Sequence, residues 1–191
     1  LYKIGIPKNE VLNDAYINLM EQIGHIAAME EANQFTQKQA VHECIALLQN
    51  KYKNEFFYTA LVNYLQGGSD NFIAQMITPF NALHRGDIFL FSVCILNFDD
   101  AMAKKIVEYW FALISSFLLM DDADDIEIDK KNIHENAFLQ SGLDAIGIDK
   151  IKNLLTTNLT ILKTINKPLA RTIDNQFVKM AQLPHIKQYL N

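Results

Sequence analysis

Residues 99–129 read DDAMAKKIVEYWFALISSFLLMDDADDIEID, and this stretch decides the class of fold. Between Trp110 and Met120 only two serines interrupt the apolar side chains, which predicts the longest helix of the chain, from about Asp100 to Asp125, capped by Asp99. The apolar run is about half as long as a membrane-spanning helix needs to be, so we expect no membrane span. Because this helix is apolar nearly all round from Phe111 to Met120, its C-terminal end should project the acids that follow into the mouth of a helical bundle.

Other segments also carry apolar side chains at the three- and four-residue spacing of a helix facing a core. In the first part of the chain they are residues 11–33, residues 36–48 with Thr36 as the cap, and residues 56–65. Further helices are expected at 71–83, with a kink or break at Pro79, at 149–165, and at 168–190, where Pro168 suits the first turn. Residues 88–96 are almost wholly apolar and should be buried, and residues 126–148 should be mostly looped.

The composition favours long regular elements with few turns. Glycine and proline number only 7 and 4 among 191 residues, and 50% of the residues are hydrophobic. The sequence contains no internal repeat and no strand-like alternation of reliable length. We therefore predict an all-α fold, with a single helical domain over residues 1–191 built as a bundle of about seven or eight helices.

Charge and cysteine usage exclude several classes of function. The formal net charge is −5, and only two of the 17 basic residues, Arg85 and Arg171, are arginines, so a surface that binds nucleic-acid phosphates is not expected. Cys44 and Cys94 lie in apolar helical stretches without the spacing of a zinc site or a disulfide framework. With no signal sequence at the start of the chain, these features predict a cytoplasmic protein.

The chemically distinctive feature is a cluster of six acidic residues among the nine positions 121–129. At the helical angle of about 100° per residue, Asp122 and Asp125 continue the stripe that is apolar one turn earlier. Carboxylates gathered at the negative end of a helix either have raised pKa values or hold a cation, and oxygen ligands favour Mg²⁺ or Ca²⁺. A magnesium site for a phosphate-bearing substrate is one interpretation. The other is that the acids are solvated charges at a helix end.

The segment Phe117–Asp125, FLLMDDADD, resembles the second aspartate-rich motif of the polyprenyl (isoprenoid) diphosphate synthases, F-Q-x-x-D-D-x-x-D. Every position fits except Leu118, where the family has Gln. Residues 84–91 are similar to the family segment in which a Lys-Thr pair opens an apolar helix upstream of the motif. The resemblance covers residues 80–128.

This resemblance implies an isoprenoid-synthase-like bundle around a deep apolar cavity. It also implies that Asp121, Asp122 and Asp125 bind Mg²⁺, that this Mg²⁺ holds a prenyl diphosphate, and that Arg85 replaces the diphosphate-binding lysine. The activity implied is prenyl transfer, in which water exclusion protects a carbocation. No catalytic residue is assigned.

The sequence also departs from the family. The best counterpart of the first aspartate-rich motif, residues 30–34, lacks both the Asp pair and the arginines near it, so the chain resembles a partial or degenerate relative. The alternative is a non-catalytic helical bundle that binds an apolar small molecule or a protein partner, with the acids as surface charge. The sequence does not decide whether the protein forms a homodimer. Glu21 and His25 stand four residues apart, as a metal-binding pair would, and are interpreted as structural.

Overall fold

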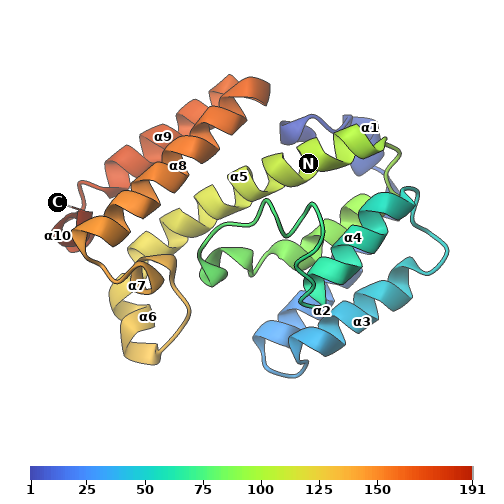
Figure 1. Cartoon of the computed structure of the whole chain (residues 1–191), viewed down its shortest axis with the longest axis horizontal. Helices are drawn as coiled ribbons and strands as arrows, with labels where there is room; N and C mark the ends of the chain where they lie inside the picture. The colour runs from blue at the N-terminus through green and yellow to red at the C-terminus, as the bar shows by residue number, and fades with distance from the viewer. Residues whose placement is uncertain (191) are drawn as a thin grey trace. The chain divides into compact units, whose positions relative to one another are not determined.

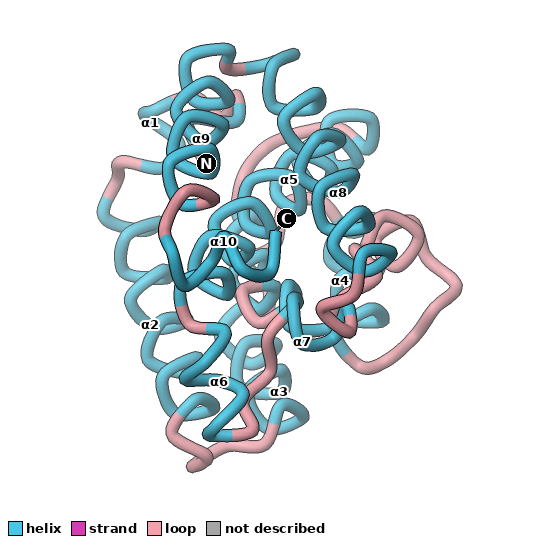
Figure 2. Tube along the Cα trace, turned by 90° about the vertical axis from the view of Figure 1, so that its left-hand side faces the viewer, coloured by secondary structure: helices cyan, strands magenta, loops and turns pink. Residues whose placement is uncertain are grey.

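The computed structural model describes residues 1–190, and within this range every regular element is helical, which confirms the all-α prediction (Figures 1 and 2). The α-helices are α1 Lys8–Val11, α2 Asp14–Glu31, α3 Gln37–Leu48, α4 Glu55–Leu65, α5 Asp100–Asp124, α6 Ile126–Asn132, α7 Ala137–Ser141, α8 Ala145–Ile165, α9 Lys167–Met180 and α10 Pro184–Leu190. Three 3₁₀ helices complete the described part: η1 Tyr2–Ile4, η2 Asn81–His84 and η3 Asp87–Ile95.

The chain forms two compact units, each made of separate stretches of sequence. The first contains Leu1–Ile77 and Gly86–Val107, and the second contains Thr78–Arg85 and the residues from Glu108 onward. The longest helix, α5, contributes its first turns to the first unit and its remainder to the second. The single domain over residues 1–191 stays a prediction.

In the first unit, η3 is the central element and packs against α2, α3 and α4. Its segment is buried as predicted, with Leu90, Phe91 and Val93 fully inaccessible to solvent, but it winds as a 3₁₀ helix. The Tyr16 hydroxyl of α2 lies 2.9 Å from the Ser92 hydroxyl, which joins the two elements by a buried hydrogen bond. The core of this unit therefore surrounds η3.

In the second unit, α8 and α9 form a pair of neighbouring helices (Figure 1), and α7 packs against α8 and η2. The predicted break before Pro168 is confirmed, since Pro168 lies in the first turn of α9 and the Asn166 side chain accepts the Leu169 N–H. A buried polar contact joins α8 to α5, where the Asn158 amide donates to the hydroxyls of Ser115 and Ser116 at 2.8 and 3.3 Å.

Several predicted helix starts are confirmed at the level of single hydrogen bonds. Thr36 forms a capping box with Gln39 at the start of α3, and Asp99 accepts the Met102 N–H at 2.7 Å at the start of α5. The helix predicted at 11–33 is α2, which begins after the cap residue Asn13. Local side-chain chemistry therefore sets these boundaries.

The helix predicted at 71–83 is wrong, because residues 71–77 form turns and only η2 is helical. The Asn71 side chain accepts the Ala74 N–H, and its amide donates to Asn63 Oδ1 and to the Gly68 carbonyl. These bonds favour a turn over a helix, and Pro79 has no N–H to donate.

Two further boundaries differ from the prediction. Residues 126–148, expected to be mostly looped, hold α6, α7 and the start of α8, and the helix expected at 168–190 divides into α9 and α10 around residues 181–183. Side-chain contacts join the short helices α6, α7 and α10 to other parts of the second unit: Tyr189 with Glu127, Asp122 with the Ala137 N–H, and His185 with Asp124. The described chain therefore has more helices than the seven or eight predicted.

Candidate functional site

The acidic cluster lies where α5 ends and α6 begins. The side chain of Asp121 is 64% exposed and that of Asp122 only 1% exposed, while Asp125 is half-buried and precedes the first residue of α6. Asp122 follows the buried stripe of α5, as its helical angle predicts. The apolar stripe of α5 did not predict which groups would donate hydrogen bonds to the buried Asp122 carboxylate.

Arg85 meets two of the predicted site residues, 36 and 37 positions further along the chain. One of its guanidinium nitrogens, Nη2, lies 2.9 Å from Asp121 Oδ2 and 2.7 Å from Asp122 Oδ1. The other, Nη1, donates to the Ala82 carbonyl at 2.9 Å. Burial acts to lower the pKa of Arg85, but the hydrogen bonds and charges of the two aspartates outweigh it and raise that pKa. The guanidinium is thus held as a permanent cation against α5.

Both carboxylate oxygens of Asp122 accept hydrogen bonds from the protein. Oδ1 accepts from Arg85, and Oδ2 accepts the Ala137 N–H at 2.7 Å, at the start of α7. Burial is the largest influence and raises the pKa of Asp122, although the Ala137 N–H and Arg85 act in the opposite direction. Asp122 therefore joins three elements of the second unit: η2 through its C-cap Arg85, α5 and α7.

Asn136 is a central residue of this network that the sequence analysis missed. Its amide donates to the Asp122 carbonyl at 2.7 Å and to Asp129 Oδ2 at 2.9 Å. Its oxygen accepts the N–H groups of Phe138 and Leu139 and so caps α7. An Asn before a short apolar run is the usual signal of an N-cap, and that signal was available in the sequence.

Three further acids of the cluster, Asp124, Glu127 and Asp129, also have partners from the second unit. His185 Nε2 lies 3.0 Å from Asp124 Oδ1, His134 Nδ1 lies 3.5 Å from Asp129 Oδ1, and the Tyr189 hydroxyl donates to Glu127. Asp125 differs, since the structure of residues 1–190 records no hydrogen bond or ion pair to its carboxylate. Burial and the charges of Asp121, Asp129 and Asp124 raise the pKa of Asp125.

In this structure, protein groups engage Asp121 and Asp122, two of the side chains to which the resemblance assigns Mg²⁺. Both oxygens of Asp122 are engaged, and Arg85 lies against Asp121 and Asp122, where a metal would need free oxygen ligands. In the described part of the chain, no group of three or more His, Cys, Asp or Glu side chains could hold a metal ion. The network instead stabilises the junction of α5, α6 and α7.

Neither cysteine provides a reactive thiol. Cys44 and Cys94 are free and fully buried in the first unit. Burial, with smaller contributions from Glu30 and Glu43, raises the pKa of Cys44 to about 12, and burial likewise raises the pKa of Cys94. Both thiols therefore stay protonated at neutral pH and are poor nucleophiles.

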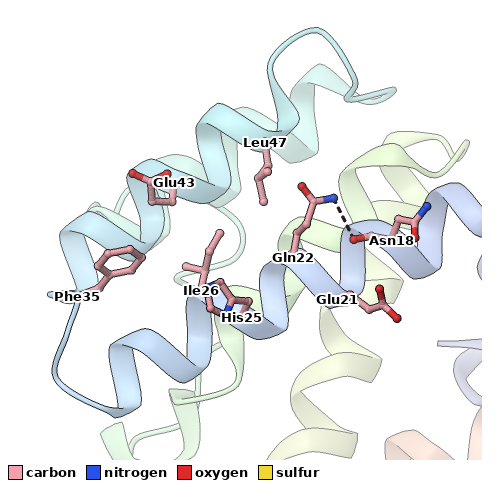
Figure 3. A pocket seen from close by; sticks show the side chains of 8 residues that line it. All are labelled: Asn18, Glu21, Gln22, His25, Ile26, Phe35, Glu43 and Leu47. Atoms are coloured by element: carbon pink, nitrogen blue, oxygen red, sulfur yellow. Dashed lines mark hydrogen bonds between the residues drawn. The ribbon is translucent and has the colours of Figure 1, made fainter.

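A second candidate site is a groove of about 670 Å³ between α2 and α3 in the first unit (Figure 3). In Figure 3, Gln22 and Ile26 point from α2 toward α3, and Leu47 points back from α3 toward α2. The full lining is Asn18, Glu21, Gln22, His25, Ile26, Phe35, Glu43 and Leu47. The volume is within the range of about 300–1,000 Å³ that is usual for ligand sites in proteins.

The lining of this α2–α3 groove combines apolar side chains with two carboxylates. Ile26 is buried and Leu47 and Phe35 are half-buried, whereas Glu21 and Glu43 are exposed. No Lys or Arg lines the groove, and within the described residues neither glutamate forms an ion pair. Glu21 and His25 both belong to the lining.

Comparison with known proteins gives no match to a family model, to a curated protein or to a solved structure. The fold and the two candidate sites define the class by themselves. The protein is all-α, with an acidic network whose carboxylates pair with groups of the same unit, and with an open groove in the other unit. None of the helices in residues 1–190 is long and apolar enough to cross a membrane.

Proposed function

We propose that the chain is a non-catalytic helical binding module whose α2–α3 groove takes a basic, amphipathic helix of a protein partner. The observation that carries this proposal is the combination, in one groove, of an apolar floor and two carboxylates that lack basic partners. This extends the alternative interpretation of the sequence, in which a helical bundle binds a protein partner.

The apolar floor supports a helical ligand. Two neighbouring helices leave a groove along their length, and an amphipathic helix fills such a groove with side chains at the i, i+3, i+4 and i+7 positions. Ile26, Phe35 and Leu47 offer contacts for these side chains. A volume of about 670 Å³ accommodates two or three of them.

The charges of the lining select the partner. Glu21 and Glu43 line the groove from different helices. Lysine or arginine side chains that flank the apolar face of a bound helix would be attracted to these carboxylates. An acidic helix would be repelled by the same carboxylates. Charge complementarity thus favours a basic partner and makes its binding dependent on salt.

A fluorescence anisotropy titration tests this proposal. The ligand is a labelled helical peptide of about 16 residues, with leucines along one face and lysines beside them, and a matched peptide carries glutamates in place of the lysines. We expect the basic peptide to bind with a Kd of about 1–50 µM and the acidic peptide to bind at least about tenfold more weakly. The charge-reversal variant Glu21→Lys/Glu43→Lys should reverse this preference.

The control is Glu108→Lys/Asp149→Lys, which changes two exposed acids of the second unit by the same total charge. If both double variants bind the basic peptide alike, attraction by net charge explains the binding and the groove is not the site. Equal affinity of the wild type for the two peptides would also contradict the proposal.

Magnesium-dependent binding or transfer of a prenyl diphosphate at Asp121–Asp125 stays a prediction, as do the isoprenoid-synthase-like fold and a cytoplasmic location. In its support, Arg85 lies against the acidic cluster, as the resemblance to polyprenyl diphosphate synthases implies. Against it, both oxygens of Asp122 already accept hydrogen bonds from the protein, with which a metal would compete. The groove proposal is favoured because its carboxylates are not engaged by the protein.

Thermal melting decides between the two functions, because a ligand that binds only the folded state raises the melting temperature. We expect no shift with millimolar Mg²⁺ and farnesyl diphosphate, in the wild type or in Asp121→Ala/Asp125→Ala. A shift that requires both Mg²⁺ and the diphosphate, and that the double variant loses, would establish the acidic cluster as a diphosphate site.

A further inference from the structure

A pocket of about 640 Å³ lies in the first unit between α4, the turns at residues 70–75 and the first turns of α5. It shares no lining residue with the α2–α3 groove. Its lining consists of Glu55, Phe56, Thr59, Ala60, Asn63, Asp70, Asn71, Phe72, Gln75 and Lys104. We call it the α4 pocket.

Two aromatic rings form one wall of the α4 pocket. Phe56 of α4 and Phe72 of the turns stack in parallel, with ring centroids 4.9 Å apart and planes within 7° of each other. Phe56 remains 41% exposed, although a Phe on a helix beside a core is usually covered. Lys104 Nζ lies over the Phe56 ring, 6.0 Å from its centroid and at the outer limit of a cation–π contact, so a ligand stacked on that face of the ring would replace this contact.

The polar lining offers hydrogen-bond donors and acceptors together. Lys104 donates, Glu55 and Asp70 accept, and Thr59 and Gln75 can do both. The hydrogen bonds of the described residues leave these side chains unused, whereas Asn71 is fully engaged in holding its own turn. The lining therefore suits a ligand whose edge carries both donors and acceptors.

The segment that closes the pocket is a long connection without regular helix. Residues 66–80 link α4 to η2, and Figure 2 draws such connections in pink. Connections longer than about 12–15 residues are uncommon in compact proteins and often form binding loops. Here the Asn71–Asn63 contact of 2.6 Å and the Phe56–Phe72 stack hold the loop against α4.

We propose that the α4 pocket binds a planar heterocycle of the purine or pyrimidine type, stacked on the Phe56–Phe72 pair. The exposed ring provides the stacking surface that such heterocycles use. The mixed polar lining matches a flat ring whose edge alternates donors and acceptors, and disfavours an aliphatic ligand. This site is independent of the proposed binding of a basic helix, so either proposal can fail alone.

Saturation-transfer NMR with adenosine, guanosine and uridine tests the proposal. We expect at least one nucleoside to bind saturably, with a Kd below about 1 mM, while ribose alone does not. Phe56→Ala should weaken that binding by about tenfold or more, which is the effect of losing one stacked ring. Gln75→Ala, an exposed polar substitution, should weaken it less and change the preference among the nucleosides.

Phe117→Ala is the matched control, since Phe117 is 45% exposed, lies on α5 and is outside the α4 pocket. It should leave nucleoside binding unchanged. Equal binding by wild type and by a folded Phe56→Ala variant, or no binding of any nucleoside, would overturn the proposal. If Phe56→Ala does not fold, Lys104→Ala and Gln75→Ala decide it, because unchanged affinity and unchanged nucleoside preference in both would place the ligand elsewhere.

Discussion

At the scale of single residues, burial separates the six acids of one cluster into different roles. Asp122 is buried, and both of its carboxylate oxygens accept hydrogen bonds. Asp121 is exposed and forms an ion pair with the same Arg85 that pairs with Asp122. Asp125 lies near the like charges of Asp121, Asp124 and Asp129. Their spacing in the sequence resembles that of an aspartate-rich metal-binding motif. The difference between them arises from Arg85 and Ala137, which approach from other parts of the chain.

Removing the Asp122 carboxylate should destabilise the protein more than any other change in the cluster. Asp122→Ala leaves the buried Ala137 N–H without its acceptor and removes the closer of the two carboxylates that pair with Arg85. We expect a loss of about 2–4 kcal/mol in the free energy of unfolding. Asp121→Ala should cost less than about 1 kcal/mol, because that ion pair is exposed. Urea denaturation measures both, and equal losses would contradict the assigned network.

Asp125 should make the protein less stable as its carboxylate ionises. Its pKa is raised above the ordinary 3.8, so over the pH range just above that value the folded protein binds more protons than the unfolded chain. The contribution of Asp125 to stability therefore falls as the pH rises through this range. Asp125→Asn also removes like-charge contacts four residues away on either side, worth about 0.5–1 kcal/mol together.

The pH dependence of melting checks this expectation. At pH 7, Asp125→Asn should melt about 1–4 °C above the wild type, and the difference should shrink as the pH is lowered to 4. A variant that is less stable than the wild type at pH 7 would show that the Asp125 carboxylate has a favourable partner after all. Glu135→Gln, an exposed acid outside the cluster, is the control.

At the scale of elements, the short helices depend on contacts rather than on intrinsic helix propensity. Helix α7 has only five residues, and Asn136 and Asp122 satisfy the N–H groups at its start. Isolated helices of this length are unstable in water, so neighbouring groups must supply the missing stability. The same reasoning applies to α6 and α10.

Helix α10 should be held by one apolar anchor more than by its polar contacts. Ile186 is completely buried, whereas the His185–Asp124 pair is about half exposed on both sides. We expect Ile186→Ala to lower the free energy of unfolding by about 2–4 kcal/mol and His185→Ala by less than about 1 kcal/mol. Urea denaturation of both variants checks this order, and a larger loss for His185→Ala would contradict it.

At the scale of the whole molecule, the chain enters the second unit at Thr78, returns to the first at Gly86 and leaves it again within α5. Hydrophobic periodicity describes one helix at a time. It does not show where the chain passes from one compact unit to the other. The network at Asp122 depends on it, because the residues from Thr78 to Arg85 place the guanidinium beside the end of α5.

The sequence by itself determined the helical class, the longest helix with its Asp99 cap, the Thr36 capping box and the burial of residues 88–96. These features depend on side chains close together in the chain, so periodicity and capping chemistry reveal them. The engagement of Asp122 and the two pockets became visible only in the folded chain. Each of these depends on contacts between residues far apart in sequence, whose desolvation and hydrogen bonding outweigh local preference.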